Sequence, residues 1–226
     1  LLKSLSHLDN SLSGYIGAYS MGITATGALD NATGTIEAST GLTLSTQSLS
    51  NTTGVIQNLS SGTLSLTTSS STSNTTGGYI GSNGNLTLSS ASLDNSSSTI
   101  YAKSGLTINS SAGVTNSSGL LQSKGDLTFS ATDALNNQGG IIEASGATGV
   151  LSLTAASIDN TLTGRIANKG TGATTLSAPT VTGSTLVAFI DNSGGTLGGN
   201  GNLTLGTAEL RNANGTILSN NNLTLN

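Results

Sequence analysis

Aspartates that recur at one place in a repeated motif are the side chains of this sequence best suited to acid–base chemistry. They stand between an aliphatic residue and an asparagine at Asp9, Asp30, Asp94, Asp159 and Asp191. Asp9 and Asp30 fall in consecutive copies of the motif, as do Asp159 and Asp191. If the copies stack as neighbouring strands, their backbones lie ~4.8 Å apart. The carboxyl groups then approach the ~5 to 5.5 Å separation of a retaining glycosidase pair.

A structural interpretation of these aspartates competes with the catalytic one. The other copies place Ser50, Ser73, Thr115, Asn136 and Arg211 at the same position. Aspartate is favoured beside turns, because its carboxylate accepts hydrogen bonds from nearby backbone amides. No cluster of lysine, arginine and aromatic residues is expected beside either pair. We therefore predict no catalytic, metal or cofactor site, and keep a polysaccharide-binding or polysaccharide-cleaving β-helix that uses outward Asp rows as the alternative hypothesis.

Composition excludes several further classes of function. The chain has no cysteine and one histidine, His7, so thiolate and two-histidine metal sites are absent. Six scattered cations against ten anions give a net charge of −4, which argues against nucleic acid as a partner. No apolar run approaches the ~20 residues that a membrane span needs, so no membrane insertion is expected.

Ser, Thr, Asn and Gly make up 127 of the 226 residues, a composition that by itself could indicate disorder. The aliphatic residues indicate an ordered repeat instead. The segment from Leu29 to Leu44 recurs along the chain in steps of 20 to 23 residues, with one step of 32. Its copies begin at Leu8, Leu29, Leu49, Thr72, Leu93, Val114, Leu135, Ile158, Ile190 and Leu210.

Each copy alternates apolar and polar residues with the period of a strand that has one buried face, as in Leu42-Thr43-Leu44 and Ile36-Glu37-Ala38. Gly and Asn separate the segments and suit tight corners. The pattern predicts an all-β fold, a right-handed parallel β-helix of about ten coils of 20 to 23 residues. Residues 1–226 form a single repeat region, which we interpret as a fragment of a longer rod with one enlarged coil at 158–189.

An asparagine fills the third position of the motif in every copy. Alternation points it inward at a corner, and a buried amide needs hydrogen-bond partners. Stacked amides can bond to the copies above and below, so we predict a structural ladder, with a simple turn-forming role as the alternative. The residues are Asn10, Asn31, Asn51, Asn74, Asn95, Asn116, Asn137, Asn160, Asn192 and Asn212.

The enlarged coil contains the only proline, which cannot donate to a strand ladder, so part of it is expected to leave the coil as a loop. Thr171, Pro179, Val181 and Phe189 are the candidate interaction residues there, and a neutral insertion is the alternative. Three tyrosines, Tyr15, Tyr79 and Tyr101, fall near the same strand. They could stack along one face, either as a carbohydrate platform or as ordinary side-chain packing.

The succession Leu-Asp-Asn, Gly-x-Ile-x-Ala and Gly-x-Leu-Thr-Leu, as in Leu93 to Ile108 and Ile190 to Leu205, resembles the haemagglutinin repeats of filamentous haemagglutinin. Related large exoproteins of two-partner secretion systems, including contact-dependent growth-inhibition effectors, share them. The resemblance covers Leu8 to Asn226.

The resemblance implies a structural stalk of a secreted or bacterial cell-surface adhesin or effector. Such a stalk displays a distal adhesive, receptor-binding or toxin region. It also implies export through an outer-membrane two-partner secretion transporter, and contact with a host or target-cell receptor through regions outside this fragment. No enzymatic activity is implied.

Overall fold

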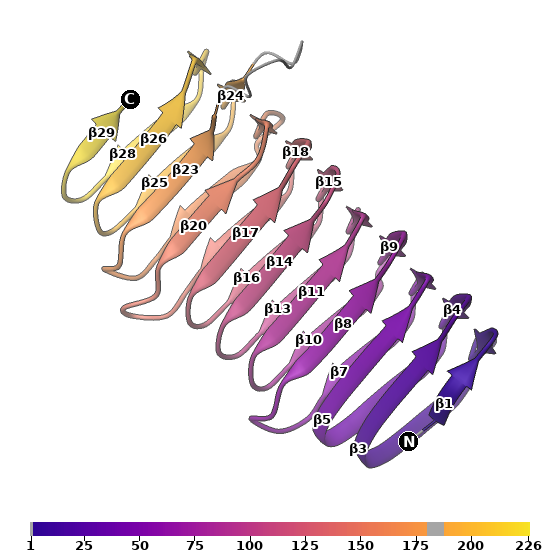
Figure 1. Ribbon diagram of the computed structural model, residues 1–226. Coiled ribbons are helices and arrows are strands. Elements are labelled where there is room, and N and C mark those ends of the chain that lie inside the picture. Colours follow the sequence, from indigo (N-terminus) through magenta and orange to yellow (C-terminus); the bar gives the residue numbers. More distant parts are fainter. Residues whose placement is uncertain (1, 180–187) are drawn as a thin grey trace.

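The computed structural model describes residues 2–179 and 188–226, and within them the regular elements are strands with no helix. The chain winds into coils that stack along one axis, with the two ends of the chain at opposite ends of the stack (Figure 1). All strand pairings in the described residues are parallel, and each joins one coil to the next. The fold is therefore the predicted parallel β-helix, with three strand columns that we call face 1, face 2 and face 3.

Face 1 is a ten-stranded sheet that takes one short strand from each coil. The middle residue of each three-residue strand points inward, as the burial of Leu29, Leu49 and Leu93 shows. The strands are β2 (Leu8–Asp9), β4 (Ala28–Asp30), β6 (Ser48–Ser50), β9 (Ser71–Ser73), β12 (Ser92–Asp94), β15 (Val114–Thr115), β18 (Ala134–Asn136), β21 (Ser157–Asp159), β24 (Phe189–Asp191) and β27 (Glu209–Arg211).

Face 2 follows face 1 along the chain after a tight corner that contains the ladder asparagine. Its four-residue strands bury their second and fourth residues, as Ile100 and Ala102 illustrate. It begins with the first parts of β3 (Tyr15–Ala25) and β5 (Thr35–Thr46). It continues with β7 (Val55–Asn58), β10 (Tyr79–Ser82), β13 (Thr99–Ala102), β16 (Leu120–Ser123), β19 (Ile141–Ala144), β22 (Arg165–Asn168), β25 (Thr196–Gly199) and β28 (Thr216–Ser219).

Face 3 completes the coil, and its strands bury alternate residues such as Leu86 and Leu88. It contains β1 (Leu2–Leu5) and the second parts of β3 and β5. Its other strands are β8 (Leu64–Thr68), β11 (Leu86–Ser90), β14 (Leu106–Ser110), β17 (Leu127–Ala131), β20 (Leu151–Thr154), β23 (Thr174–Ala178), β26 (Leu203–Thr207) and β29 (Leu223–Leu225).

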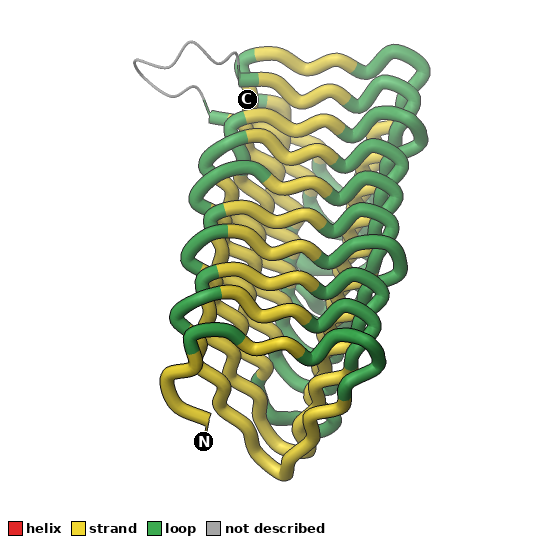
Figure 2. The backbone as a smooth tube through the Cα atoms, turned by 90° about the vertical axis from the view of Figure 1, so that its right-hand side faces the viewer, coloured by secondary structure: helices red, strands yellow, loops and turns green. Residues whose placement is uncertain are grey.

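Inward aliphatic side chains from the three faces form one continuous core along the stack. In register, Ile80 lies next to Ile100, which lies next to Leu121, so like side chains stack on like. Figure 2 shows the coils lying directly over one another. One coil buries too few apolar groups to offset the entropy of ordering about 21 residues at ~1.5 kcal/mol each, so neighbouring coils stabilise one another.

Candidate functional site

The most regular polar feature of the molecule is the asparagine at the corner between face 1 and face 2. Its side-chain Nδ2 donates to Oδ1 of the asparagine in the next coil at 2.7 or 2.8 Å, in an unbroken series from Asn10 to Asn212. Each side chain from Asn31 to Asn192 in this series is fully buried, while Asn212 is exposed. The ten predicted asparagines therefore lie in one hydrogen-bonded column inside the corner.

Each ladder amide also binds the backbone of its own corner and of the next coil. Asn95 Nδ2 lies 3.3 Å from the carbonyl oxygen of Ser98 and 3.2 Å from that of Leu120. In most coils the own-corner carbonyl belongs to a glycine instead, as with Gly54 for Asn51. A Cβ at Gly54 would lie 2.1 Å from the carbonyl oxygen of Asn31 and 2.6 Å from Oδ1 of Asn51. At Gly54 the close approach of the coils therefore leaves no room for a side chain, whereas the coil of Asn95 accommodates Ser98 at the same position.

The recurrent aspartates lie immediately before the ladder and bind the same corner. In all five, Oδ1 accepts a hydrogen bond from the backbone amide two residues later, at 2.9 or 3.0 Å. This is the turn that aspartate favours through its side chain. At Asp9, hydrogen bonds from the side chain and the backbone of Ser11 lower the pKa of the carboxyl group. The geometry assigns these aspartates to corner stabilisation.

The two aspartate pairs lie in register, Asp9 beside Asp30 and Asp159 beside Asp191. Local partners already bind Asp159, whose oxygens accept from the Thr161 hydroxyl at 2.7 Å and from the Gln138 amide at 2.8 Å. These contacts leave this carboxylate engaged by its neighbours rather than directed at a substrate.

One arginine and one aromatic ring lie beside Asp191, although no cluster of such residues was expected there. Arg211 Nη1 lies 3.8 Å from Asp191 Oδ2, and the guanidinium carbon lies 4.9 Å from the centroid of the Phe189 ring. Register brings them together, because β24 and β27 are neighbours and Asp191 pairs with Arg211. However, Arg211 donates to both Glu209 oxygens, at 2.7 and 3.0 Å, which lowers the pKa of Glu209. Arg211 is thus occupied and covers the ring that a sugar would need.

A model of the haemagglutinin repeat matches residues 8–67, 59–186 and 170–226, so its three matches span almost the entire chain. The chain belongs to the haemagglutinin repeat family. A comparison with curated proteins found no match, and neither did a comparison with solved structures. The haemagglutinin repeat is typical of adhesin-like proteins that are secreted or held at the cell surface. The described residues contain no helix that could cross a membrane.

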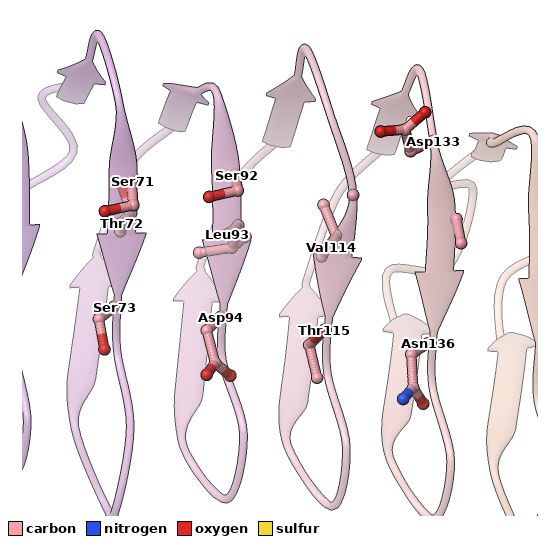
Figure 3. Close-up of a pocket in the computed structure, with 12 residues that line it drawn as sticks. Ser71, Thr72, Ser73, Ser92, Leu93, Asp94, Val114, Thr115, Asp133 and Asn136 are labelled. Carbon is pink, nitrogen blue, oxygen red and sulfur yellow. The ribbon is translucent and has the colours of Figure 1, made fainter.

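A hollow on the surface of this haemagglutinin repeat region lies over face 1 and has a volume of about 480 Å³. Figure 3 shows the residues that line it, which include Ser71 on β9, Ser92 on β12, Val114 on β15 and Asn136 on β18. Asp94 and Asp133 are among the residues that line it, and Asp94 Oδ1 accepts from both the amide and the hydroxyl of Ser96. Among the described residues there is no group of three or more His, Cys, Asp or Glu that could hold a metal ion.

Glu143 on face 2 is a buried, fully paired carboxylate that the sequence analysis did not single out. It is 3% exposed and accepts from Gln122 at 2.8 Å, from Lys169 at 3.0 Å and from Arg165. Burial raises the pKa of Glu143, but hydrogen bonds from Arg165, Lys169 and Gln122 outweigh this effect, so its pKa lies below the ordinary value. The sequence already indicated the contact between Gln122 and Glu143, because these two residues occupy the same position in successive copies of the repeat.

The tyrosines of face 2 do not form a single column. Tyr79 pairs in register with Thr99, whereas Tyr101 pairs with Gly81, so the two residues are offset by two positions. Tyr15 lies several coils away and donates to Glu37 at 2.6 Å, which raises the pKa of Tyr15. Burial raises the pKa of Tyr79. The rings of Tyr15 and Tyr79 lie over their own strands, since a Cβ at Gly17 would lie 2.5 Å from the Tyr15 hydroxyl oxygen and one at Gly81 would lie 2.2 Å from that of Tyr79.

The candidate interaction residues of the enlarged coil lie in different places. Thr171 lies in the ordinary corner before β23, whose residues Thr174 to Ser177 pair in register with β20. Pro179 is exposed directly after β23, and Phe189 begins β24 under Arg211. Val181 lies outside the described residues. The residues that enlarge this coil therefore fall between Ala178, where β23 ends, and Phe189, where β24 begins.

Proposed function

We propose that this haemagglutinin repeat region is a non-catalytic, rigid stalk segment of a secreted or cell-surface protein. The stalk separates a distal adhesive, receptor-binding or toxin region from the surface that carries it. The observation that supports this most directly is the unbroken asparagine ladder, because it fixes one register over the whole stack. At ~4.8 Å per coil, ten coils give a rod about 48 Å long.

The charge distribution supports a scaffold rather than a catalyst. Where charged groups meet in the described residues, as at Glu143, Glu209 and Arg211, they bind one another. The repeated aspartates bind their own corners, as Asp94 and Asp159 do. An acid–base enzyme instead needs two groups whose environments hold them in different protonation states and that face a substrate.

Two further parts of the proposal follow from the family. Export through an outer-membrane two-partner secretion transporter suits a chain without cysteine, since no disulfide has to form after transport. A host or target-cell receptor would meet regions outside this segment. Whether the parent protein acts as an adhesin or delivers a toxin depends on those regions.

Removal of one whole coil tests the stalk function. Deletion of residues 93–113 joins equivalent positions of two copies and removes one asparagine, so Asn74 would meet Asn116 directly. We expect a folded protein whose long dimension, measured by small-angle X-ray scattering, is shorter by about 4.8 Å. A deletion protein that unfolds would show that the coils are not interchangeable units and would refute the proposal.

The polysaccharide alternative is tested on the same protein. The double variant Asp159→Asn, Asp191→Asn removes the carboxylate pair that lies nearest to an aromatic ring and an arginine. We expect neither the unaltered protein nor this variant to release reducing ends from acidic or neutral polysaccharides. Release by the unaltered protein that disappears in the variant would establish the enzyme and overturn the stalk.

A further inference from the structure

Face 3 presents an uncharged array of hydroxyl groups to solvent. Inward residues such as Leu106 and Ile108 alternate with outward residues such as Thr107. The first outward position is a threonine or serine in nine successive coils, the second coil to the last. We call this column of outward residues the first rank. It consists of Thr43, Ser65, Thr87, Thr107, Thr128, Ser152, Thr175, Thr204 and Thr224.

A second rank runs parallel to the first, two residues further along each strand. It is made of small uncharged residues: Ser45, Thr67, Ser89, Asn109, Ser130, Thr154, Ser177, Gly206 and Asn226. The two ranks contain no charged and no aromatic residue, whereas face 2 carries Glu143 and Arg165 and face 1 carries Asp159. The two ranks therefore lack the charged groups that pair with ions and the aromatic rings that stack on sugars or anchor protein partners.

The hydroxyl groups of the two ranks have no partner inside the described protein. None of them forms a hydrogen bond with another described residue. In contrast, the hydroxyls at the ends of the strands do, as Thr46 donates to Gly27 at 2.6 Å and Ser110 to Ala91 at 2.8 Å. A hydroxyl can donate one hydrogen bond and accept two. The outward hydroxyls of face 3 can therefore still form hydrogen bonds with solvent or a ligand, whereas the hydroxyls at the strand ends are already paired.

The array is also periodic and straight. From β5 to β29 the described pairings of face 3 keep a constant register, and the register shifts in the described chain occur only between β1 and β3 and between β3 and β5. Figure 1 shows β8, β11, β14 and β17 as evenly spaced neighbours. The positions of the two ranks repeat at ~4.8 Å along the stack and at ~6.6 Å along each strand, over a length of about 38 Å. All nine positions of the first rank carry a hydroxyl, and all positions of the second rank do except Asn109, Gly206 and Asn226.

Shallow troughs accompany the two ranks. One of about 420 Å³ lies along Thr87, Thr107 and Thr128 of the first rank. Another of about 440 Å³ runs beside Ser89 and Asn109 of the second rank. Asp126 lies at the edge of the first trough, and its carboxylate accepts from the backbone amide of Val150 at 2.8 Å. Both troughs are open. The one along the first rank is mostly polar, whereas the one beside the second rank is mostly apolar. Open hollows of this kind suit a row of ordered water molecules better than one compact ligand.

We propose that face 3 binds crystalline water, so that this region adsorbs to ice and slows its growth. The rectangular net of hydroxyl groups resembles the rectangular net of oxygen atoms on the prism faces of hexagonal ice. Each hydroxyl contributes little alone, but a rigid array engages many lattice sites at once without a further ordering cost. Threonine dominates the first rank, and its methyl group adds a small apolar contact beside each hydroxyl.

The test compares two double variants of the whole chain. Thr107→Lys with Thr128→Lys places two bulky charges in the centre of the first rank. Thr35→Lys with Thr99→Lys is the matched control, because it makes the same change at outward positions of face 2. Circular dichroism and thermal unfolding establish that both variants keep the fold.

The measurement is the gap between the melting and growth temperatures of a single ice crystal, together with inhibition of ice recrystallisation. We expect activity in the unaltered protein, loss of most of it in the face 3 variant, and no change in the face 2 control. Absence of activity in the unaltered protein overturns the proposal, as does an equal response of the two variants. Retention on microcrystalline cellulose without any effect on ice would assign face 3 to a polysaccharide instead. None of these results bears on the stalk function.

Discussion

Replacement of Asn95 by alanine tests whether the ladder or only the turn stabilises the rod. In the native structure Asn95 Oδ1 accepts from Asn74 at 2.7 Å, and its Nδ2 donates to Asn116 Oδ1 at 2.7 Å. Alanine removes both bonds. Asn116 Oδ1 loses its donor while fully buried, whereas Asn74 Nδ2 keeps the carbonyl oxygens of Gly78 and Thr99.

The expected loss of stability depends on Asn116, because Asn116 loses its hydrogen-bond partner whereas Asn74 keeps others. A buried acceptor left without a donor costs about 1 to 3 kcal/mol, and Asn116 Oδ1 is the group that meets this condition. We expect Asn95→Ala to lower the free energy of unfolding by that amount, measured by urea denaturation monitored by circular dichroism. Asn212→Ala is the control, because Asn212 is exposed and water can replace its bonds. Its effect should be smaller than that of Asn95→Ala.

A double variant separates the ladder from the turn. If Asn95 and Asn116 act through their shared hydrogen bond, the double alanine variant loses less stability than the sum of the two single variants, because the orphaned acceptor is removed as well. If each residue acts only as a turn former, the two losses add. Additive losses, or equal losses at Asn95 and Asn212, would refute the ladder as a source of stability.

Three more predictions concern the corners and the buried carboxylate. Thr76 has a φ of 54° and no side-chain partner among the described residues; Thr76→Asn, matching Asn214 at the same place, should raise the unfolding free energy by up to about 1 kcal/mol. Gly54→Ala should lower it by about 1 to 3 kcal/mol through the clash with Asn31 and Asn51, while Gly206→Ala, whose nearest contact would be 3.8 Å, should be nearly neutral in the same urea titration. Because the pKa of Glu143 is lower in the folded state than its ordinary 4.5, its contribution is full above pH 4.5 and disappears as the pH falls through the folded pKa. Glu143→Gln should therefore flatten the acid limb of unfolding free energy against pH, and an unchanged limb would contradict the ion pairing.

The coil was predictable from sequence because its determinants are local and repeated. Alternation in segments such as Leu42-Thr43-Leu44 specifies which side of the strand is buried, and the asparagine marks one corner of each coil. Contacts between outward side chains of different coils were harder to predict. Glu143 meets Arg165 and Lys169 only because the next coil lies in register on face 2, and Arg211 meets Phe189 in the same way on face 1.

The enlarged coil shows why an insertion is difficult to place by composition. Thr174 stands where Leu151 and Leu203 stand in the neighbouring coils, so its strand lacks an aliphatic residue that marks the same strand in other copies. Backbone pairing on both sides keeps this segment in the stack despite the polar residue, and the Oγ1 atom of Thr174 remains buried without a partner. Neighbouring coils thus override a locally unfavourable residue, which a copy-by-copy analysis does not capture.

The corner and the faces divide the physical requirements of the rod between them. The asparagine column fixes register from inside, because each buried amide finds its partners only when consecutive coils are aligned. The column of inward aliphatic side chains buries the apolar surface that stabilises the fold. The outward positions contribute to neither the register nor the core. Face 2 can therefore carry an ion-pair network around Glu143, while the two ranks of face 3 carry only uncharged residues. A rod built in this way can change its surface chemistry coil by coil without changing its fold, which is the property that a display scaffold needs.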